Sequence, residues 1–163
     1  MTDPKPPSQS SAPASSDTPA AAPSQPLIGV VVVTHGQLAT ELVNAAEMIA
    51  GDLPQFAAVS IGWHDDVEAA KEAIAVAIAR VSRNAGVIVL TDMFGGTPSN
   101  LGMTFLEKDK VEVITGVNLP MVIKLANLRA SSDLLAVARQ MRDDGRNAIW
   151  VASDFLRGEK TGT

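Results

Sequence analysis

Residues 27–34 read LIGVVVVT, an apolar run in which four valines follow one another. A strand with one face in water alternates apolar and polar residues, so an unbroken β-branched run indicates a strand covered on both faces, as in a parallel sheet. The segment 86–92, GVIVLTD, has the same character. Two such strands in one chain require helices to cover them, and the sequence therefore predicts an α/β protein.

The segments between and after these strands change to helical spacing, in which apolar residues recur every three or four positions. Val67, Ala70 and Ile74, for example, lie on one face of a helix that we expect over 65–82. We expect the other helices over 37–50, 97–107, 119–128 and 132–144, and further strands over 55–61, 111–115 and 148–152.

This alternation of strands and helices predicts a mostly parallel, open sheet with helices on both faces. We expect the flavodoxin-like strand order 2-1-3-4, with the first strand beside the third, and a last strand that could lie antiparallel at an edge. In such sheets the binding crevice lies at the carboxyl ends of the strands where the order reverses. The crevice is therefore expected between the loops that follow the first and third strands.

One domain is expected. Of the first 26 residues, 18 are Pro, Ser or Ala, too little apolar side chain to offset the entropy of ordering, so we predict a disordered tail over 1–26. The remaining length suits a single domain over 27–157, followed by a flexible C-terminus over 158–163.

Composition excludes several classes of protein. The absence of cysteine excludes a disulfide scaffold, a thiolate zinc site and a cysteine nucleophile. The longest apolar run, 27–33, is far shorter than the ~20 residues of a membrane span, and the first residues lack the apolar core of a secretory signal. The net charge is −5 and no two basic residues adjoin, which argues against nucleic-acid binding. We expect a soluble, cytoplasmic protein.

Polar loops follow three of the expected strands: Thr-His-Gly at 34–36, Asp-Met-Phe-Gly-Gly-Thr-Pro at 92–98, and Gly-Val-Asn-Leu-Pro at 116–120. All three would meet at the carboxyl edge of the sheet. Two of them carry titratable side chains, and we expect His35 and Asp92 to be neighbours although 57 residues separate them.

A lone histidine is most often structural, but His35 ends a central strand and Gly36 leaves space in front of its ring. No second His or Cys lies in these loops, so we expect no metal site. Asp92 alone could cap a helix. Opposite His35, its carboxylate would accept from one ring nitrogen and leave the lone pair of the other facing outward. Such a histidine can act as a general base or as a nucleophile.

Gly95 and Gly96 stand before a helix that has Thr97 and Pro98 in its first turn. On this motif alone a plain loop with a threonine cap is the simpler interpretation. Beside a histidine and its carboxylate, free N–H groups at a helix start and the Thr97 hydroxyl would form an anion site. We therefore expect Gly36, together with these two glycines and the threonine, around a phosphoryl group transferred to His35.

Taken in order over about 27–155, these three motifs resemble the mannose-type enzyme IIA component of the bacterial phosphoenolpyruvate-dependent sugar phosphotransferase system (PTS). The resemblance implies a phosphotransferase that carries a phosphoryl group on histidine, accepts it from the phosphocarrier protein HPr and passes it to a IIB component. It implies that His35 is phosphorylated, that Asp92 orients it and that Thr97 contacts the phosphate, without a cofactor. Family members are usually homodimers, and some exchange the last strand.

The chain also departs from the transport proteins of this family. Gln37 follows His-Gly where tryptophan is frequent, and no IIB domain follows in this sequence. The alternative is a regulatory interaction protein whose His35 phosphorylation state is the signal, with no dedicated sugar transport. Trp63 and His64 precede the helix of 65–82; we interpret them as exposed structural residues, with a partner-docking surface as the alternative. Lys124 and Arg129 could help to hold an anion.

Other uses of this fold fit less well. A phospho-acceptor receiver module needs paired acids after the first strand, where this chain has Thr-His-Gly. A nucleotide site needs a Gly-rich motif that is absent here. A hydrolase using His35 as a base would need a nucleophilic serine in a sharp turn, and Ser99 is too deep in its expected helix to serve.

Overall fold

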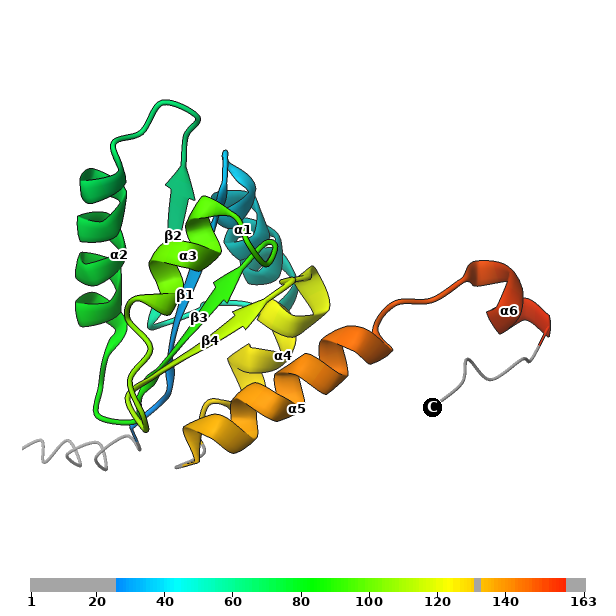
Figure 1. The fold of residues 1–163 in the computed structure, drawn as a ribbon. Helices are drawn as coiled ribbons and strands as arrows, with labels where there is room; N and C mark the ends of the chain where they lie inside the picture. The colour runs from blue at the N-terminus through cyan, green and yellow to red at the C-terminus, as the bar shows by residue number, and fades with distance from the viewer. Residues whose placement is uncertain (1–25, 131–132, 158–163) are drawn as a thin grey trace, which may run out of the picture.

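The protein, described here by a computed structural model over residues 26–130 and 133–157, has three layers, with a parallel sheet between two layers of helices (Figure 1). The predicted tail, apart from Pro26, and the predicted C-terminal segment 158–163 lie outside the described residues. The strands are β1 (Gly29–His35), β2 (Phe56–Ile61), β3 (Val87–Thr91) and β4 (Val111–Thr115); the helices are α1 (Leu38–Ala50), α2 (Val67–Val81), α3 (Thr97–Met103), α4 (Leu119–Leu128), α5 (Leu134–Asn147) and α6 (Ala152–Arg157).

The strand order is β2-β1-β3-β4 and all neighbours are parallel, which confirms the predicted fold class and order. The register places His35 beside Ile61 of β2, and Val33 beside Thr91 of β3. The carboxyl ends of these strands therefore share one edge of the sheet. The strand order reverses at β1, and His35 is its last residue.

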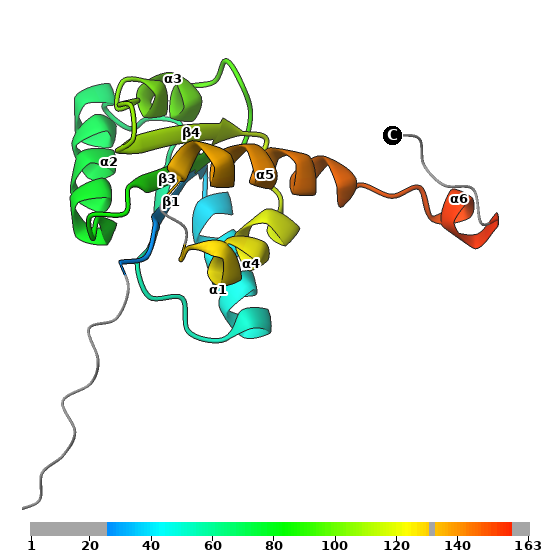
Figure 2. The same cartoon turned by 90° about the horizontal axis from the view of Figure 1, so that it is seen from below.

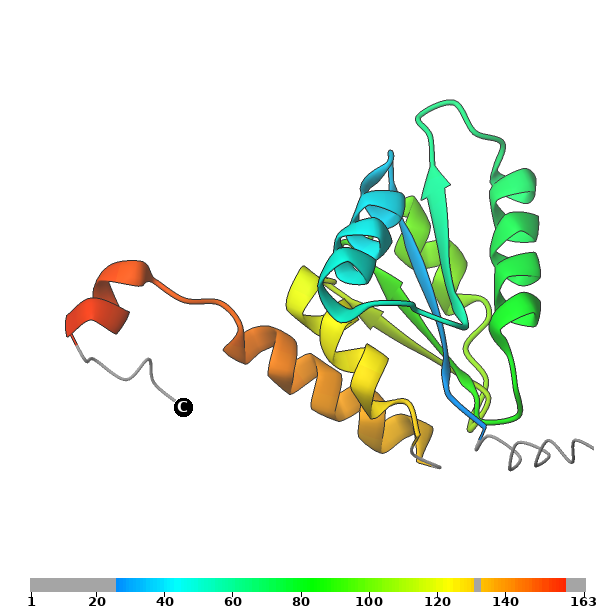
Figure 3. The same ribbon diagram turned by 180° about the vertical axis from the view of Figure 1, so that it is seen from behind.

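Alternate valines of β1 explain why the strand is apolar throughout. Val30 and Val32 belong to the core formed with α1, α4 and α5, the helices on the left and lower left of the sheet in Figure 3. Val31 and Val33 belong to the core formed with α2 and α3, on the opposite face (Figure 2). All four are fully buried, and a buried valine stabilises a fold by roughly 1.5–3 kcal/mol relative to an exposed one.

The helices differ in how they begin. Asp66, Asn118 and Asp133 cap α2, α4 and α5, each accepting from the N–H three residues further along the chain. The helices α1 and α3 instead start after Gln37 and Gly96, with no side-chain cap. Because the first N–H groups of a helix have no partner within it, these two starts leave backbone donors open. Both follow the central strands, β1 and β3.

Helix α3 ends at Met103, four residues before the predicted end at 107. The Thr104 hydroxyl donates to the Leu101 carbonyl at 2.7 Å, and the chain turns there toward the start of β4. Helix α2 agrees more closely with its predicted span of 65–82. None of the helices in the described ranges is long and apolar enough to cross a membrane.

The strand expected over 148–152 is wrong. The chain leaves α5 at Asn147, passes through 149–151 without regular structure and enters α6, which stands apart from the three layers (Figures 1 and 2). A strand forms only where a neighbouring strand pairs with its N–H and C=O groups, and this segment runs past the end of β4. The side chains of Ile149 and Val151, which suggested a strand, are mostly exposed.

We predict that Gly29→Ala destabilises the fold, because a Cβ there would lie 2.6 Å from the Val81 carbonyl oxygen at the end of α2. Backbone atoms cannot yield as side-chain ends do, so the free energy of unfolding should fall by about 1–3 kcal/mol in urea titrations. Val76→Ala, at an exposed position of α2, is the control and should change it by less than about 0.5 kcal/mol. Equal midpoints for both variants would contradict this packing.

Candidate functional site

His35 lies where the sequence predicts, at the carboxyl end of the central strand. The N–H of Gly36 donates to the Ile61 carbonyl at 2.8 Å, which ties the turn after β1 to the end of β2. Gly36 has a φ of +57°, a conformation that glycine adopts at little cost. About half of the His35 side chain is exposed (48%), so another molecule can reach its ring.

Asp92 holds both the backbone and the ring of His35. One carboxylate oxygen, Oδ2, accepts from the His35 N–H at 3.0 Å and lies 2.8 Å from ring atom Nδ1. The other, Oδ1, accepts from the N–H of Met93 at 3.0 Å. The structure thus brings together the two residues that sequence reasoning paired across 57 positions.

Burial by itself would raise the pKa of Asp92, but the hydrogen bonds and charge of His35, with the N–H of Met93, outweigh it and lower the pKa below the usual 3.8. Asp92 is therefore ionised at neutral pH and can only accept hydrogen bonds. In a neutral imidazole the nitrogen that faces it, Nδ1, must then carry the proton. The lone pair is on Nε2.

Gly96 lies against the edge of the ring that bears Nε2. A Cβ at this position would lie 2.7 Å from Cε1 of His35 and 3.2 Å from Nε2. Only glycine therefore allows the backbone before α3 to approach the ring so closely. The uncapped start of α3 adjoins the nitrogen that carries the lone pair.

Ser99 braces this glycine turn, a role that the sequence analysis missed. Its side chain is fully buried, and its hydroxyl accepts from the Gly95 N–H and donates to the Gly96 carbonyl, both at 3.0 Å. The N–H of Gly95 is thus engaged within the turn, while Thr97 is exposed as the first residue of α3. A serine three residues after a glycine at a helix start is the signal that could have revealed the brace.

The third polar loop, at 116–120, follows β4 and is hydrogen-bonded to the end of β3. The N–H groups of Gly116 and Val117 donate to the Thr91 carbonyl at the end of β3. Asn118 caps α4, and its amide donates to the Gly145 carbonyl of α5 at 2.9 Å. This loop therefore links α4 and α5 to the end of β3, at the carboxyl edge of the sheet.

The two cations considered for anion binding have other partners. Lys124 is 2.8 Å from a carboxylate oxygen of Asp144 on α5. Arg129 is buried; its guanidinium donates to the Pro54 carbonyl and lies 4.8 Å from the centre of the Phe56 ring. Neither contacts His35 or Asp92.

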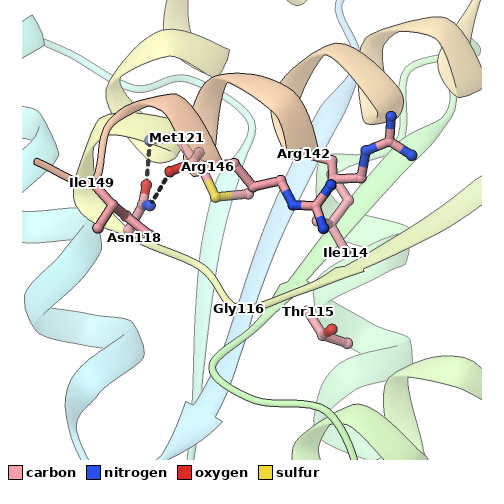
Figure 4. A pocket seen from close by; sticks show the side chains of 9 residues that line it. Ile114, Thr115, Gly116, Asn118, Met121, Arg142, Arg146 and Ile149 are labelled. Carbon is pink, nitrogen blue, oxygen red and sulfur yellow. Dashed lines mark hydrogen bonds between the residues drawn. The ribbon is translucent and has the colours of Figure 1, made fainter. Parts of the chain in front are cut away.

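A cavity of about 260 Å³ lies between the end of β4 and α5 (Figure 4). Figure 4 shows Asn118 and Met121 at one end of it and the side chains of Arg142 and Arg146 reaching along it from α5. None of its lining residues comes from the loops after β1 or β3. It is therefore a separate feature from the His35 site.

Comparison with known proteins finds relatives of this chain among components of the PTS. The family model described as "PTS system fructose IIA component" (EIIA-man) matches residues 29–141. The fructose-specific EIIA component of Bacillus subtilis (strain 168) is 26% identical over 136 residues, covering 83% of this chain and 93% of that protein. The mannose-specific EIIAB component of Escherichia coli (strain K12) is 31% identical over 132 residues, covering 75% of this chain and 39% of that protein.

Solved structures share the fold. The mannose/sorbose specific IIA subunit of Enterococcus faecalis superposes with a TM-score of 0.67 at 28% identity, covering 77% of this chain and 94% of that one. The EIIA component of Streptococcus agalactiae gives a TM-score of 0.71 at 21% identity, covering 78% and 98% of the two chains. Since the family model matches more than half of the residues, this chain belongs to the EIIA-man family of the phosphotransferase system.

Proposed function

We propose that the protein is a histidine phosphoryl carrier, in which Nε2 of His35 accepts a phosphoryl group from an HPr-like protein and passes it to a IIB component. The observation that carries this proposal is the 2.8 Å contact between Asp92 and Nδ1, which leaves the lone pair on Nε2 of a half-exposed side chain. The names of the relatives, PTS components for fructose and for mannose, support the donor and acceptor classes.

In the proposed step, the Nε2 lone pair attacks the phosphorus of the donor's phosphohistidine in line. The new N–P bond forms as the donor's N–P bond breaks, and the donor nitrogen keeps the electron pair of that bond. Nδ1 of His35 keeps its proton, and this N–H remains hydrogen-bonded to the Asp92 carboxylate. The ring gains positive charge on phosphorylation, and the adjacent carboxylate stabilises that charge. Positioning and electrostatics supply the catalysis, as in other phosphoryl transfers.

The starts of α1 and α3 suit the oxygens of the phosphoryl group. Neither helix has a side-chain cap, and the N–H groups and dipole of a helix start favour an anion. Gly96 lies beside Nε2, and Thr97, next to it, adds an exposed hydroxyl. Gly36 lies in the turn after β1 and Gly95 in the turn before α3, both with positive φ. Together with Gly96 and Thr97 they make up the proposed phosphate site.

Phosphorylation of His35 is the direct test. After incubation with phosphoenolpyruvate, enzyme I and HPr, the intact mass of the wild type should show one acid-labile phosphoryl group, whereas His35→Ala should show none. Addition of a IIB component should then remove the label, because a carrier passes the group on; a label that persists would favour the regulatory alternative. No label on the wild type, or an equal label on His35→Ala, would contradict the proposal.

A second prediction concerns Gly96. In Gly96→Ala the new methyl group would occupy the space of Cε1, so the ring must move and lose its alignment. A misplacement of 1 Å can slow catalysis by about 100-fold, and we expect a loss of that order in the rate of transfer to His35, measured by rapid quench.

Gly102→Ala is the matched control, because a Cβ there meets its neighbours at ordinary distances of 3.5–3.8 Å. This variant should transfer at close to the wild-type rate, and thermal melting should show that both variants fold. A wild-type rate for Gly96→Ala would mean that the close approach to the ring has no part in the reaction.

A further inference from the structure

Trp63 is 95% exposed, more than any other large apolar side chain among the described residues. It lies in the loop of residues 62–66 between β2 and α2. A tryptophan can bury 150–250 Å² of surface on contact, yet here the indole packs against almost nothing in its own chain. The fold gives no reason for an indole at this position.

The sheet register places this loop next to the reactive histidine. His35 pairs with Ile61 across β1 and β2, and Trp63 follows Ile61 by two residues. With strands about 4.8 Å apart and successive Cα atoms about 3.8 Å apart, the Cα of Trp63 lies within about 12 Å of that of His35. A standard interface covers about 800 Å² on each partner, a disc of about 16 Å radius. A protein centred on His35 would therefore cover Trp63.

The loop is also held in place before any partner arrives. The N–H of Gly62 donates to the Asp65 carboxylate at 2.6 Å, and Asp66 accepts from the Ala69 N–H at 3.0 Å as the cap of α2. The hydrogen bond from Gly62 to Asp65 thus closes the turn that carries Trp63, and the Asp66 cap fixes the start of α2 directly after it. A fixed turn presents its side chain with little loss of conformational entropy on binding.

Other exposed apolar side chains follow the strands that end near His35. Leu38 follows β1, and Met93 and Phe94 follow β3; their exposed fractions are 45%, 53% and 73%. We call these residues and Trp63 the apolar rim: exposed apolar residues that follow three neighbouring strands, β2, β1 and β3, at one edge of the sheet, with Leu38 as the first residue of α1. Apolar residues gathered in this way mark a binding surface, whereas single ones do not.

The charge around the rim indicates the kind of partner. Residues 26–70 and 84–107, which include the loops after β1, β2 and β3, contain no Lys or Arg, whereas Asp65 and Asp66 follow Trp63 and His64 in the same loop. A partner that complements this face presents an apolar patch bordered by basic side chains.

We propose that Trp63 is the aromatic anchor on which the phosphoryl-donor protein docks, with the donor's phosphohistidine over Nε2 of His35. The inference rests on the proposed carrier function. It adds a residue that increases the affinity for the donor without taking part in the reaction. Tryptophan is among the residues that most often dominate a protein interface. Trp63 is a positioning residue: it acts on the docked donor and touches no reacting atom.

The test compares Trp63→Ala with Met48→Ala. Met48 is 89% exposed but lies near the far end of α1, away from His35. The rate of phosphoryl transfer is measured against the concentration of phospho-HPr. For Trp63→Ala the half-saturating concentration should rise about 30-fold, the effect of losing a dominant interface residue, with little change in the maximal rate. Met48→Ala should match the wild type, and Trp63→Phe should recover part of the affinity.

Phosphoramidate, a small donor that needs no docking surface, separates the two proposals. It should label His35 equally fast in the wild type and in Trp63→Ala. If it does, but Trp63→Ala also saturates with phospho-HPr at the wild-type concentration, the anchor is refuted and the carrier stands. If Trp63→Ala slows labelling by phosphoramidate, the residue acts on the site itself and the anchor is again refuted. If neither donor labels His35 in the wild type, both proposals fail.

Discussion

The hydrogen bond between the Asp92 carboxylate and Nδ1 of His35 is the interaction on which the chemistry of this protein depends. It joins the ends of two neighbouring strands, so it exists only while β1 and β3 keep their register. A slip of one residue would turn His35 to the other face of the sheet. The buried valines of β1 fix that register, and the packing of the core thereby sets the tautomer of an exposed ring.

Around this pair, small residues let the backbone approach the ring of His35, and no basic side chain among the two that were considered lies beside it. Gly96 allows the start of α3 to lie against the edge of the ring, and the Ser99 hydroxyl fixes this turn by hydrogen bonds to Gly95 and Gly96. Lys124 and Arg129 are engaged elsewhere. An anion at Nε2 would then meet backbone N–H groups in place of basic side chains, and a basic partner would complement the surrounding surface.

Sequence reasoning predicted what depends on local pattern. Unbroken β-branched runs indicated the buried parallel strands, and their order placed His35 beside Asp92. The brace by Ser99 was missed because its hydroxyl bonds depend on how the glycine turn folds back. The strand over 148–152 was wrong because β-branched and aromatic residues favour a strand only where a neighbouring strand offers pairing, and 149–151 lies beyond β4. The place of His35 at the end of its strand was predictable from local pattern, whereas the pairing of 148–152 with an edge strand of the sheet was not.

Identification of the ring nitrogen that carries the phosphoryl group would test the central claim most directly. The protein would be labelled with ¹⁵N-histidine in a His64→Gln background, which leaves His35 as the one histidine of the chain, and phosphorylated through HPr. The account predicts ³¹P–¹⁵N coupling at Nε2, with Nδ1 still protonated against Asp92. Coupling at Nδ1 would contradict it, because that nitrogen could not then donate to the carboxylate.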